Sequence, residues 1–269
     1  MVNMVIEYFL TTRSIYGGVH MGSVIAILGA GTGLGVSLAR RFGREGYDVA
    51  LVGRRAERLE AIAAELAGEG IRATPFPADL ATPAVIPGLI SHIEETLGLI
   101  DVLVYGPISG HQGFTPAKDV TTSDLQELIP LLLMSPVAAV RAVLPNMVAR
   151  GSGTVLLTQG SFAAHPLPYL SGPAPVMAAA RNYFHSLNGE VLESGVFAGV
   201  LSIGASIAGS EMAELAQAAA PELSESQGGV DPADLADVAW QMHSNQAPLE
   251  SVIFGPPAPA AESTTTATE

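Results

Sequence analysis

Short apolar runs alternate with longer amphipathic segments along most of the chain. The runs rich in β-branched residues fall at 23–28, 48–53, 71–76, 100–105, 153–159, 197–203 and 250–255. Apolar residues recur at helical spacing over 34–45, 57–68, 83–97, 122–149, 176–193 and 231–243. Because strands that alternate with such helices form parallel β-α-β units, the pattern predicts a single-domain α/β fold with a doubly wound parallel sheet.

The two ends of the sequence lack this alternation. We interpret residues 1–20 as an extension outside the fold and residues 256–269, rich in Pro, Ala, Ser and Thr, as a disordered tail. The predicted domain therefore covers residues 21–255. The start lacks a basic n-region and a cleavage site, so we expect no signal peptide. No uninterrupted apolar run reaches the roughly 18–20 residues that span a bilayer, so we also expect no membrane-spanning segment.

Composition narrows the classes of function. The 269 residues are 48% hydrophobic, which is enough for one substantial core. The formal net charge of −14 leaves no basic patch for phosphates and argues against a nucleic-acid or anionic-membrane partner. Cysteine is absent, which excludes disulfides, thiolate metal ligands and cysteine nucleophiles. We expect a cytoplasmic protein that acts on a small molecule and binds no metal.

A glycine-rich stretch, GAGTGLG, directly follows the first predicted strand and opens the first predicted helix. Gly29 permits a tight turn, Gly33 lets the backbone approach a pyrophosphate, and Gly35 lets the helix pack closely on the strand. The helix N-terminus offers free N–H groups to phosphates. We predict a nucleotide site here, and the alternative is a glycine-rich turn without a ligand. The predicted contacts are Gly29, Thr32, Gly33, Leu34 and Gly35.

The end of the second predicted strand distinguishes between the two nicotinamide cofactors. An acidic residue there binds ribose hydroxyls, whereas arginine pairs with a 2′-phosphate. Gly53 occupies the acidic place, and Arg54 and Arg55 follow it. The sequence therefore favours NADP(H), and the alternative is a pair of solvated arginines at a helix start. Asp79 and Leu80, after the third predicted strand, are expected near the adenine.

These features resemble those of the short-chain dehydrogenase/reductase family. Besides the glycine loop, the resemblance rests on the segments ADL (78–80), AVLPNMVARGSGTVLLTQGS (142–161) and VLSIG (200–204). It runs from about residue 22 to 255. It implies a Rossmann-type fold, a nicotinamide cofactor, and a homodimer or homotetramer that associates through the helices predicted at 122–149 and 176–193.

The catalytic equipment departs from the family pattern. Pro173 and Met177 stand where the resemblance implies a tyrosine and a lysine, and Lys118 is the only lysine in the sequence. Leu132 replaces the family's helix asparagine, and YGPISG (105–110) replaces its Asn-Asn-Ala-Gly. Proline and methionine cannot deliver a proton or bind the nicotinamide ribose, so the usual mechanism is lost. Only the family's serine carries over, to Ser161.

Four side chains are candidates to take over these roles. Tyr169 is the second catalytic candidate beside Ser161, because its hydroxyl would reach a substrate oxygen, and the alternative is an aromatic cover for the pocket. His165, in the same loop, titrates near neutral pH unless it is a simple surface residue. Arg181 shares the face of Met177 and either replaces the lysine charge or has a structural or interface role. Tyr105 ends the fourth predicted strand and is expected where cofactor and substrate meet.

Three functions fit the sequence. The first is a divergent NADP(H)-dependent oxidoreductase that reduces a carbonyl, imine or activated double bond. Residues 205–229 stand where the resemblance implies a substrate lid. Because this segment is apolar and acidic with no basic residue, the substrate would be neutral or hydrophobic. The second is a catalytically silent NADP(H)-binding sensor or structural protein. The third is a non-redox cyclase or isomerase on the same scaffold.

Overall fold

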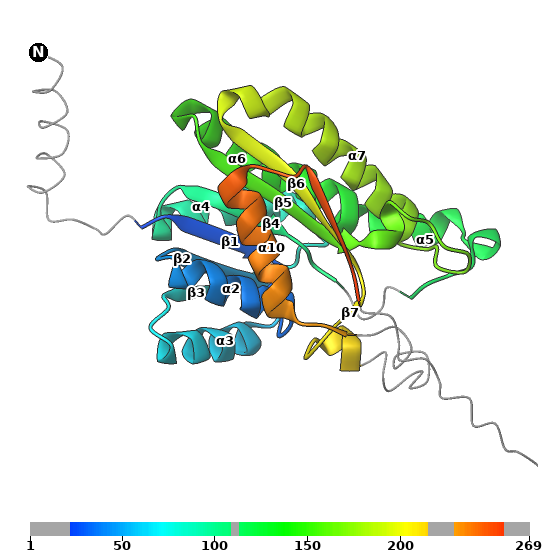
Figure 1. Cartoon of the computed structure of the whole chain (residues 1–269), viewed down its shortest axis with the longest axis horizontal. Helices are drawn as coiled ribbons and strands as arrows, with labels where there is room; N and C mark the ends of the chain where they lie inside the picture. The colour runs from blue at the N-terminus through cyan, green and yellow to red at the C-terminus, as the bar shows by residue number, and fades with distance from the viewer. Residues whose placement is uncertain (1–21, 109–112, 215–228, 256–269) are drawn as a thin grey trace, which may run out of the picture.

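A computed structural model of the chain describes residues 22–108, 113–214 and 229–255 (Figure 1). The predicted extension at 1–20 and tail at 256–269 lie outside the described residues. One seven-stranded sheet runs through the described part, in the order β3-β2-β1-β4-β5-β6-β9, and all its strands are parallel. The strands are β1 (Val24–Leu28), β2 (Asp48–Gly53), β3 (Ala73–Pro77), β4 (Ile100–Tyr105), β5 (Gly153–Gly160), β6 (Val196–Gly204) and β9 (Glu250–Phe254). The doubly wound α/β fold predicted from the sequence is confirmed.

Helices cover both faces of this sheet (Figure 1). One face carries α2 (Leu34–Arg44), α3 (Ala56–Gly68) and α10 (Pro232–Asn245). The other carries α4 (Ile86–Leu97), α6 (Ser135–Arg150) and α7 (Ala174–Val191). The central strands are therefore buried on both sides, and every residue of β1 is buried, which explains why its sequence VIAIL is continuously apolar.

The helix predicted over 122–149 is divided into three parts. It begins as α5 (Thr122–Ile129), passes through a π-helical turn, η3 (Pro130–Met134), and continues as α6. A capping box between Thr121 and Asp124 starts it. The change of winding coincides with Pro130, whose ring lacks the N–H that an α-helix uses. Helical periodicity alone does not reveal this π-helical turn. The turn places Leu132 near the carboxyl ends of the strands, where the candidate site lies.

This same stretch bears on the expectation of no membrane-spanning segment. The 29-residue helical segment Thr122–Arg150 contains an 18-residue window with a mean hydropathy of 1.8, so it is long and apolar enough to span a membrane by length and composition alone. Polar residues and prolines interrupt it, so the sequence shows no uninterrupted apolar run of that length. One face of the segment packs on the sheet, where Val140, Val143 and Met147 are fully buried. That packing is typical of a core helix in an α/β protein.

A small second sheet follows β6. Its strands, β7 (Ser206–Ile207) and β8 (Gly229–Val230), are parallel and only two residues long, and the sequence pattern did not predict them. The backbone N–H of Ala208 also donates to the carbonyl of Val230. These bonds hold the start of the predicted lid against the segment that leads into α10. Residues 215–228 of that lid lie outside the described part of the chain.

Candidate functional site

The carboxyl ends of β1 and β4 meet where the strand order of the sheet reverses. In open α/β sheets, ligands bind at this point. Gly29 turns the chain after β1 with a φ of 108°, and a Cβ built there would lie 2.6 Å from the backbone nitrogen of Pro107. Only glycine fits that conformation and that approach. The structure therefore places Gly29 in a tight turn, and its contact with a cofactor stays a prediction.

The N-terminus of α2 meets the requirements of an anion site. No side chain of the described residues caps it, and its first turn holds no acidic residue. The N–H of Val36 donates to the carbonyl of Gly31 at 3.0 Å, whereas the N–H groups of Leu34 and Gly35 make no hydrogen bond with a described residue and are available to an acceptor. Gly35 allows the helix to approach the turn, because a Cβ there would lie 2.8 Å from the Cα atom of Ala30. Gly33 faces the segment after β6, because a Cβ there would lie 2.7 Å from the Cβ of Ser210. Pyrophosphate binding by Gly29, Thr32, Gly33, Leu34 and Gly35 stays a prediction.

Two arginines beside this loop converge on one carboxylate. Arg55 donates to Glu211 through both terminal nitrogens, at 3.2 Å (Nη1 to Oε1) and 2.6 Å (Nη2 to Oε2). Arg58 donates from Nη1 to the same Oε2 at 2.7 Å. Its other nitrogen, Nη2, donates to Oγ1 of Thr32 at 3.0 Å. The guanidinium groups and the glycine loop therefore form one anion-binding cluster.

Sequence reasoning named Arg54 and Arg55 and missed Arg58 and Glu211. Arg54 is exposed and makes no ion pair with any described residue. Arg58 follows Arg55 by three residues, and residues at this spacing are neighbours on a helix surface, so that spacing was the available signal. Glu211 had no such signal, because only the fold brings the segment after β6 to the end of β2.

Two side-chain hydrogen bonds help to hold the predicted adenine turn in place. A carboxylate oxygen of Asp79, Oδ1, accepts from the N–H of Ala81 at 3.1 Å. The hydroxyl of Ser135 donates to the carbonyl of Leu80 at 2.6 Å. The Leu80 side chain is 3% exposed and belongs to the core. This turn can therefore offer a ligand its backbone and the second carboxylate oxygen of Asp79.

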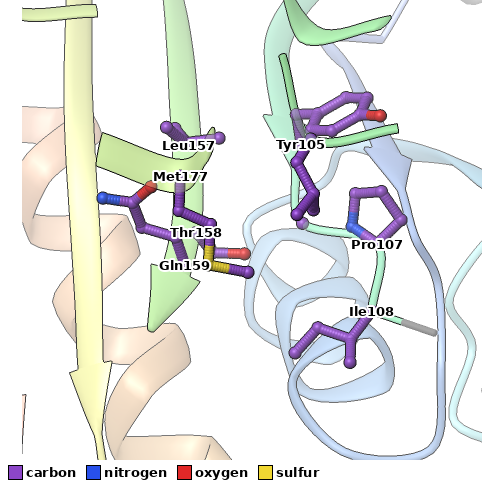
Figure 2. Close-up of a pocket in the computed structure, with 9 residues that line it drawn as sticks. Tyr105, Pro107, Ile108, Leu157, Thr158, Gln159 and Met177 are labelled. Carbon is purple, nitrogen blue, oxygen red and sulfur yellow. The ribbon is translucent and has the colours of Figure 1, made fainter. Parts of the chain in front are cut away.

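A small pocket lies between the carboxyl ends of β4 and β5 (Figure 2). The Thr158 hydroxyl and the Met177 thioether face Pro107 and Ile108 across it, whereas the Gln159 amide turns away from this gap (Figure 2). A Cβ on Gly106 would lie 1.9 Å from the Thr158 Oγ1, so glycine is required beside that hydroxyl. The pocket is mostly apolar. Its lining residues are Tyr105, Gly106, Pro107, Ile108, Leu132, Leu157, Thr158, Gln159 and Met177.

Tyr105 lines this pocket as part of its wall. Its side chain is 2% exposed, and its hydroxyl donates to the backbone carbonyl of Leu131 in η3. Burial raises the pKa of the phenol well above its ordinary value, so the phenol stays protonated across the physiological range. Tyr105 therefore anchors the π-helical turn to β4 and is a poor proton donor to a substrate.

The two predicted catalytic residues lie outside the lining of the pocket. Ser161 is 7% exposed and begins the turn η4 (Ser161–Ala163) after β5. A Cβ on Gly204 would lie 2.5 Å from its Oγ, so the hydroxyl faces the end of β6. Tyr169 is 71% exposed on the following loop, with a φ of 67°. His165, on the same loop, is exposed, and its ring centroid lies 5.9 Å from that of Phe254.

The helix that should carry the tyrosine and lysine begins directly after Pro173. Met177, one turn on, lines the pocket, and its N–H donates to the Pro173 carbonyl at 3.0 Å. Arg181, the candidate replacement for the lysine charge, instead donates from Nε to both carboxylate oxygens of Glu250 on β9, at 2.9 and 2.8 Å. Its charge is therefore used to bind α7 to the edge of the sheet. Lys118 is exposed and does not line the pocket.

Comparison with known sequences places these features in a family. The short chain dehydrogenase family matches residues 23–224. A short chain dehydrogenase from Pseudocercospora fijiensis is 29% identical over 70% of this chain. The dehydrogenase/reductase SDR family member 7B from Danio rerio is 32% identical over 67% of this chain. This chain spans 60% of the length of each of these two relatives.

Solved structures show the same fold. L-Sorbose reductase from Gluconobacter frateurii, complexed with NADPH and L-sorbose, is similar with a TM-score of 0.73 at 23% identity, over 87% of this chain and 95% of its own. A metagenomic short-chain oxidoreductase in complex with NADP has a TM-score of 0.71 at 22% identity, over 87% and 97%. The matched sequence segment, the parallel sheet and the glycine loop all indicate the same family. The chain belongs to the short-chain dehydrogenase family.

Proposed function

We propose that this protein is an NADP(H)-dependent oxidoreductase. The observation that carries the proposal is the cluster in which Arg55 and Arg58 hold one carboxylate beside the uncapped N-terminus of α2. Two guanidinium groups that donate hydrogen bonds to both oxygens of one carboxylate supply the charged N–H donors that a 2′-phosphate requires. The NADP and NADPH in the solved relatives support the same cofactor class.

Each part of the site has a separate task in this proposal. NADPH supplies a hydride when bound. The glycine loop would hold its pyrophosphate, Arg55 and Arg58 its 2′-phosphate, and the turn at Asp79 its adenine. The mostly apolar lining beside Met177 and Leu132 would favour a neutral or hydrophobic substrate.

The substrate class follows from the proton donors that the pocket lacks. The Thr158 hydroxyl can hydrogen-bond a substrate atom, but its high pKa makes it a poor acid. Ser161 and Tyr169 lie outside the pocket lining. An imine needs less help than a carbonyl, because its nitrogen is often protonated before hydride arrives. We therefore propose imines as the favoured substrates, ahead of carbonyls and activated double bonds, with protons drawn from solvent.

A specific observation favours a second candidate, a catalytically silent NADP(H)-binding protein. Tyr105 is the one titratable side chain in the described lining of the pocket, and its phenol proton is donated to Leu131. Losing a general acid typically slows such a reaction by about 10²- to 10⁴-fold. A protein that keeps its cofactor cluster but lacks this acid is suited to sensing or structural work.

Substrate-dependent oxidation of NADPH separates the two candidates. The purified protein would be assayed against matched panels of cyclic imines and ketones, with NADPH absorbance and product formation both recorded. The oxidoreductase proposal predicts turnover of imines above ketones. Thr158→Val should then raise KM, whereas Ser161→Ala and Tyr169→Phe should change the rate little. NADPH binding without turnover of either panel would favour the silent protein. Product without NADPH consumption would favour a non-redox reaction.

We also propose that the protein assembles as a homo-oligomer through α6 and α7. Met134 and Val148, on η3 and α6, are 54% and 41% exposed, so the long helix presents apolar side chains to solvent. The resemblance to short-chain dehydrogenases supports the same surface. Light scattering tests the proposal, because a monomeric mass at micromolar concentration would contradict it.

A further inference from the structure

Glu211 is the side chain that occupies the anion cluster. Its carboxylate accepts from both terminal nitrogens of Arg55 and from Arg58, and it lies beside the glycine loop because Arg58 also donates to Thr32. A carboxylate and a phosphate are recognised by the same guanidinium fork. Any 2′-phosphate that uses these two arginines must therefore displace Glu211.

The backbone around Glu211 fixes it over the loop. Ser210 precedes it and lies against Gly33, where a Cβ would be 2.7 Å from the Cβ of Ser210. The Ser210 hydroxyl accepts from the N–H of Ala213 at 3.1 Å and so caps the turn that carries Glu211. The pairing of β7 with β8 holds the preceding residues. The carboxylate is thus presented to the arginines by a defined local structure.

The charges in the cluster are only partly compensated. Glu211 contributes one negative charge to two guanidinium groups, whereas a 2′-phosphate brings more than one charge and three acceptor oxygens. The side chains of Arg55, Arg58 and Glu211 are 59%, 25% and 46% exposed. Ion pairs this exposed are weak. A phosphate can therefore replace the carboxylate, and the carboxylate reduces the affinity of the phosphate by a modest factor.

NADH differs from NADPH only in lacking that phosphate. Its binding therefore leaves Glu211 free to stay on Arg55 and Arg58. Gly53 leaves the usual acidic place at the end of β2 without a carboxylate. Glu211, from a distant part of the chain, is the carboxylate that the fold brings to these arginines.

We propose that Glu211 determines the cofactor preference by competing with the 2′-phosphate for Arg55 and Arg58. This inference rests on the proposed NADP(H) function. It adds a residue, Glu211, that lowers the affinity for the phosphorylated cofactor. The wild-type protein then discriminates less strongly between the two cofactors than its arginines alone would allow.

Calorimetric titration of the Glu211→Gln variant with NADPH and with NADH tests this. Because exposed ion pairs contribute little, we expect the NADPH Kd to fall by about five-fold and the NADH Kd to rise or stay within about two-fold. Glu214→Gln is the matched control, because Glu214 lies on the same turn and makes no ion pair with any described residue. It should leave the ratio of the two Kd values unchanged.

A double-variant comparison makes the test independent of general charge effects. The gain in NADPH affinity from Glu211→Gln should disappear in an Arg55→Gln, Arg58→Gln background, because no guanidinium remains to be competed for. An unchanged Kd ratio in Glu211→Gln, or an equal gain for both cofactors, would overturn the inference while the NADP(H) function stands. Failure of the wild type and the variant to bind either cofactor would overturn both.

Discussion

Arg58 donates a 3.0 Å hydrogen bond from Nη2 to Oγ1 of Thr32 and so joins the helix after β2 to the glycine loop after β1. Together with the hydrogen bond to Glu211, this bond fixes the orientation of the Arg58 guanidinium. It also explains why the anion cluster and the uncapped helix N-terminus lie together. The relationship is central to the proposed cofactor site.

Replacing Arg58 should weaken NADPH far more than NADH. Arg58→Gln removes one charged donor from the 2′-phosphate, and the loss of such a bond raises Kd by about ten-fold or more. The NADH Kd should change by less than about two-fold. Arg44→Gln is the control, because Arg44 lies at the far end of α2 and pairs with Glu69. Equal weakening of both cofactors by Arg58→Gln would contradict the assignment.

Two glycines of the same loop should respond differently to alanine. A Cβ at Gly35 would lie 2.8 Å from the Cα atom of Ala30, whereas a Cβ at Gly31 would meet nothing within 4 Å. Gly35→Ala should lower the free energy of unfolding by about 1–3 kcal/mol through overpacking. Gly31→Ala should leave it nearly unchanged. Urea denaturation followed by circular dichroism measures both, and equal effects would mean that the loop has another conformation.

The ion pair of Glu250 predicts a pH dependence of stability. Burial, the largest single cause, raises the pKa of Glu250, but hydrogen bonds from Arg181 and Ser202 together with the charges of Arg181 and His185 outweigh it, so the pKa lies below its ordinary value of 4.5. A carboxyl whose pKa is lowered by folding stabilises the protein above its ordinary pKa, and this stabilisation is lost as pH falls through the folded-state pKa.

Glu250→Gln should therefore lower the free energy of unfolding at pH 7 by about 1–2 kcal/mol, through the loss of charge-assisted hydrogen bonds. The difference from wild type should shrink as the pH falls below 4.5. Urea titrations at several pH values measure it. A difference that stays constant from neutral to acid pH would show that packing, and not ionisation, accounts for the loss.

Tyr105 should contribute to stability through its hydroxyl. Tyr105→Phe leaves the Leu131 carbonyl without its donor, which should cost about 1–2 kcal/mol of unfolding free energy. Tyr183→Phe is the matched control, because the Tyr183 hydroxyl makes no hydrogen bond with a described residue and its ring remains packed on Phe184. Thermal or urea unfolding compares them, and equal losses would remove the special role assigned to the bond at Leu131.

Much of the fold could be predicted because its signals are local. The buried strands β1, β2 and β4 are continuous apolar runs, and the helices between them have regular apolar spacing. Gly29 and Gly35 could be interpreted because a turn and a close helix approach each exclude a side chain. Boundaries shifted by one to three residues where a strand or helix ends in a turn.

The rest of the site depends on contacts between distant segments. Glu211 reaches Arg55 across 156 residues of sequence, and no periodicity encodes that contact. The π-helical turn at Pro130 has the uniformly apolar sequence PLLLM, which does not distinguish it from a buried α-helical turn. The predicted roles of Ser161 and Tyr169 came from family resemblance and chain spacing, which do not say which way a side chain points. The structure places Met177 and Thr158 in the pocket lining, and the catalytic roles of Ser161 and Tyr169 stay predictions.

The most direct test of the NADP(H) assignment is calorimetric titration of the purified wild-type protein with NADPH and, in parallel, with NADH. The account predicts micromolar binding of NADPH, weaker binding of NADH, and a stoichiometry of one per chain. Failure of both cofactors to bind would contradict the account, as would tighter binding of NADH.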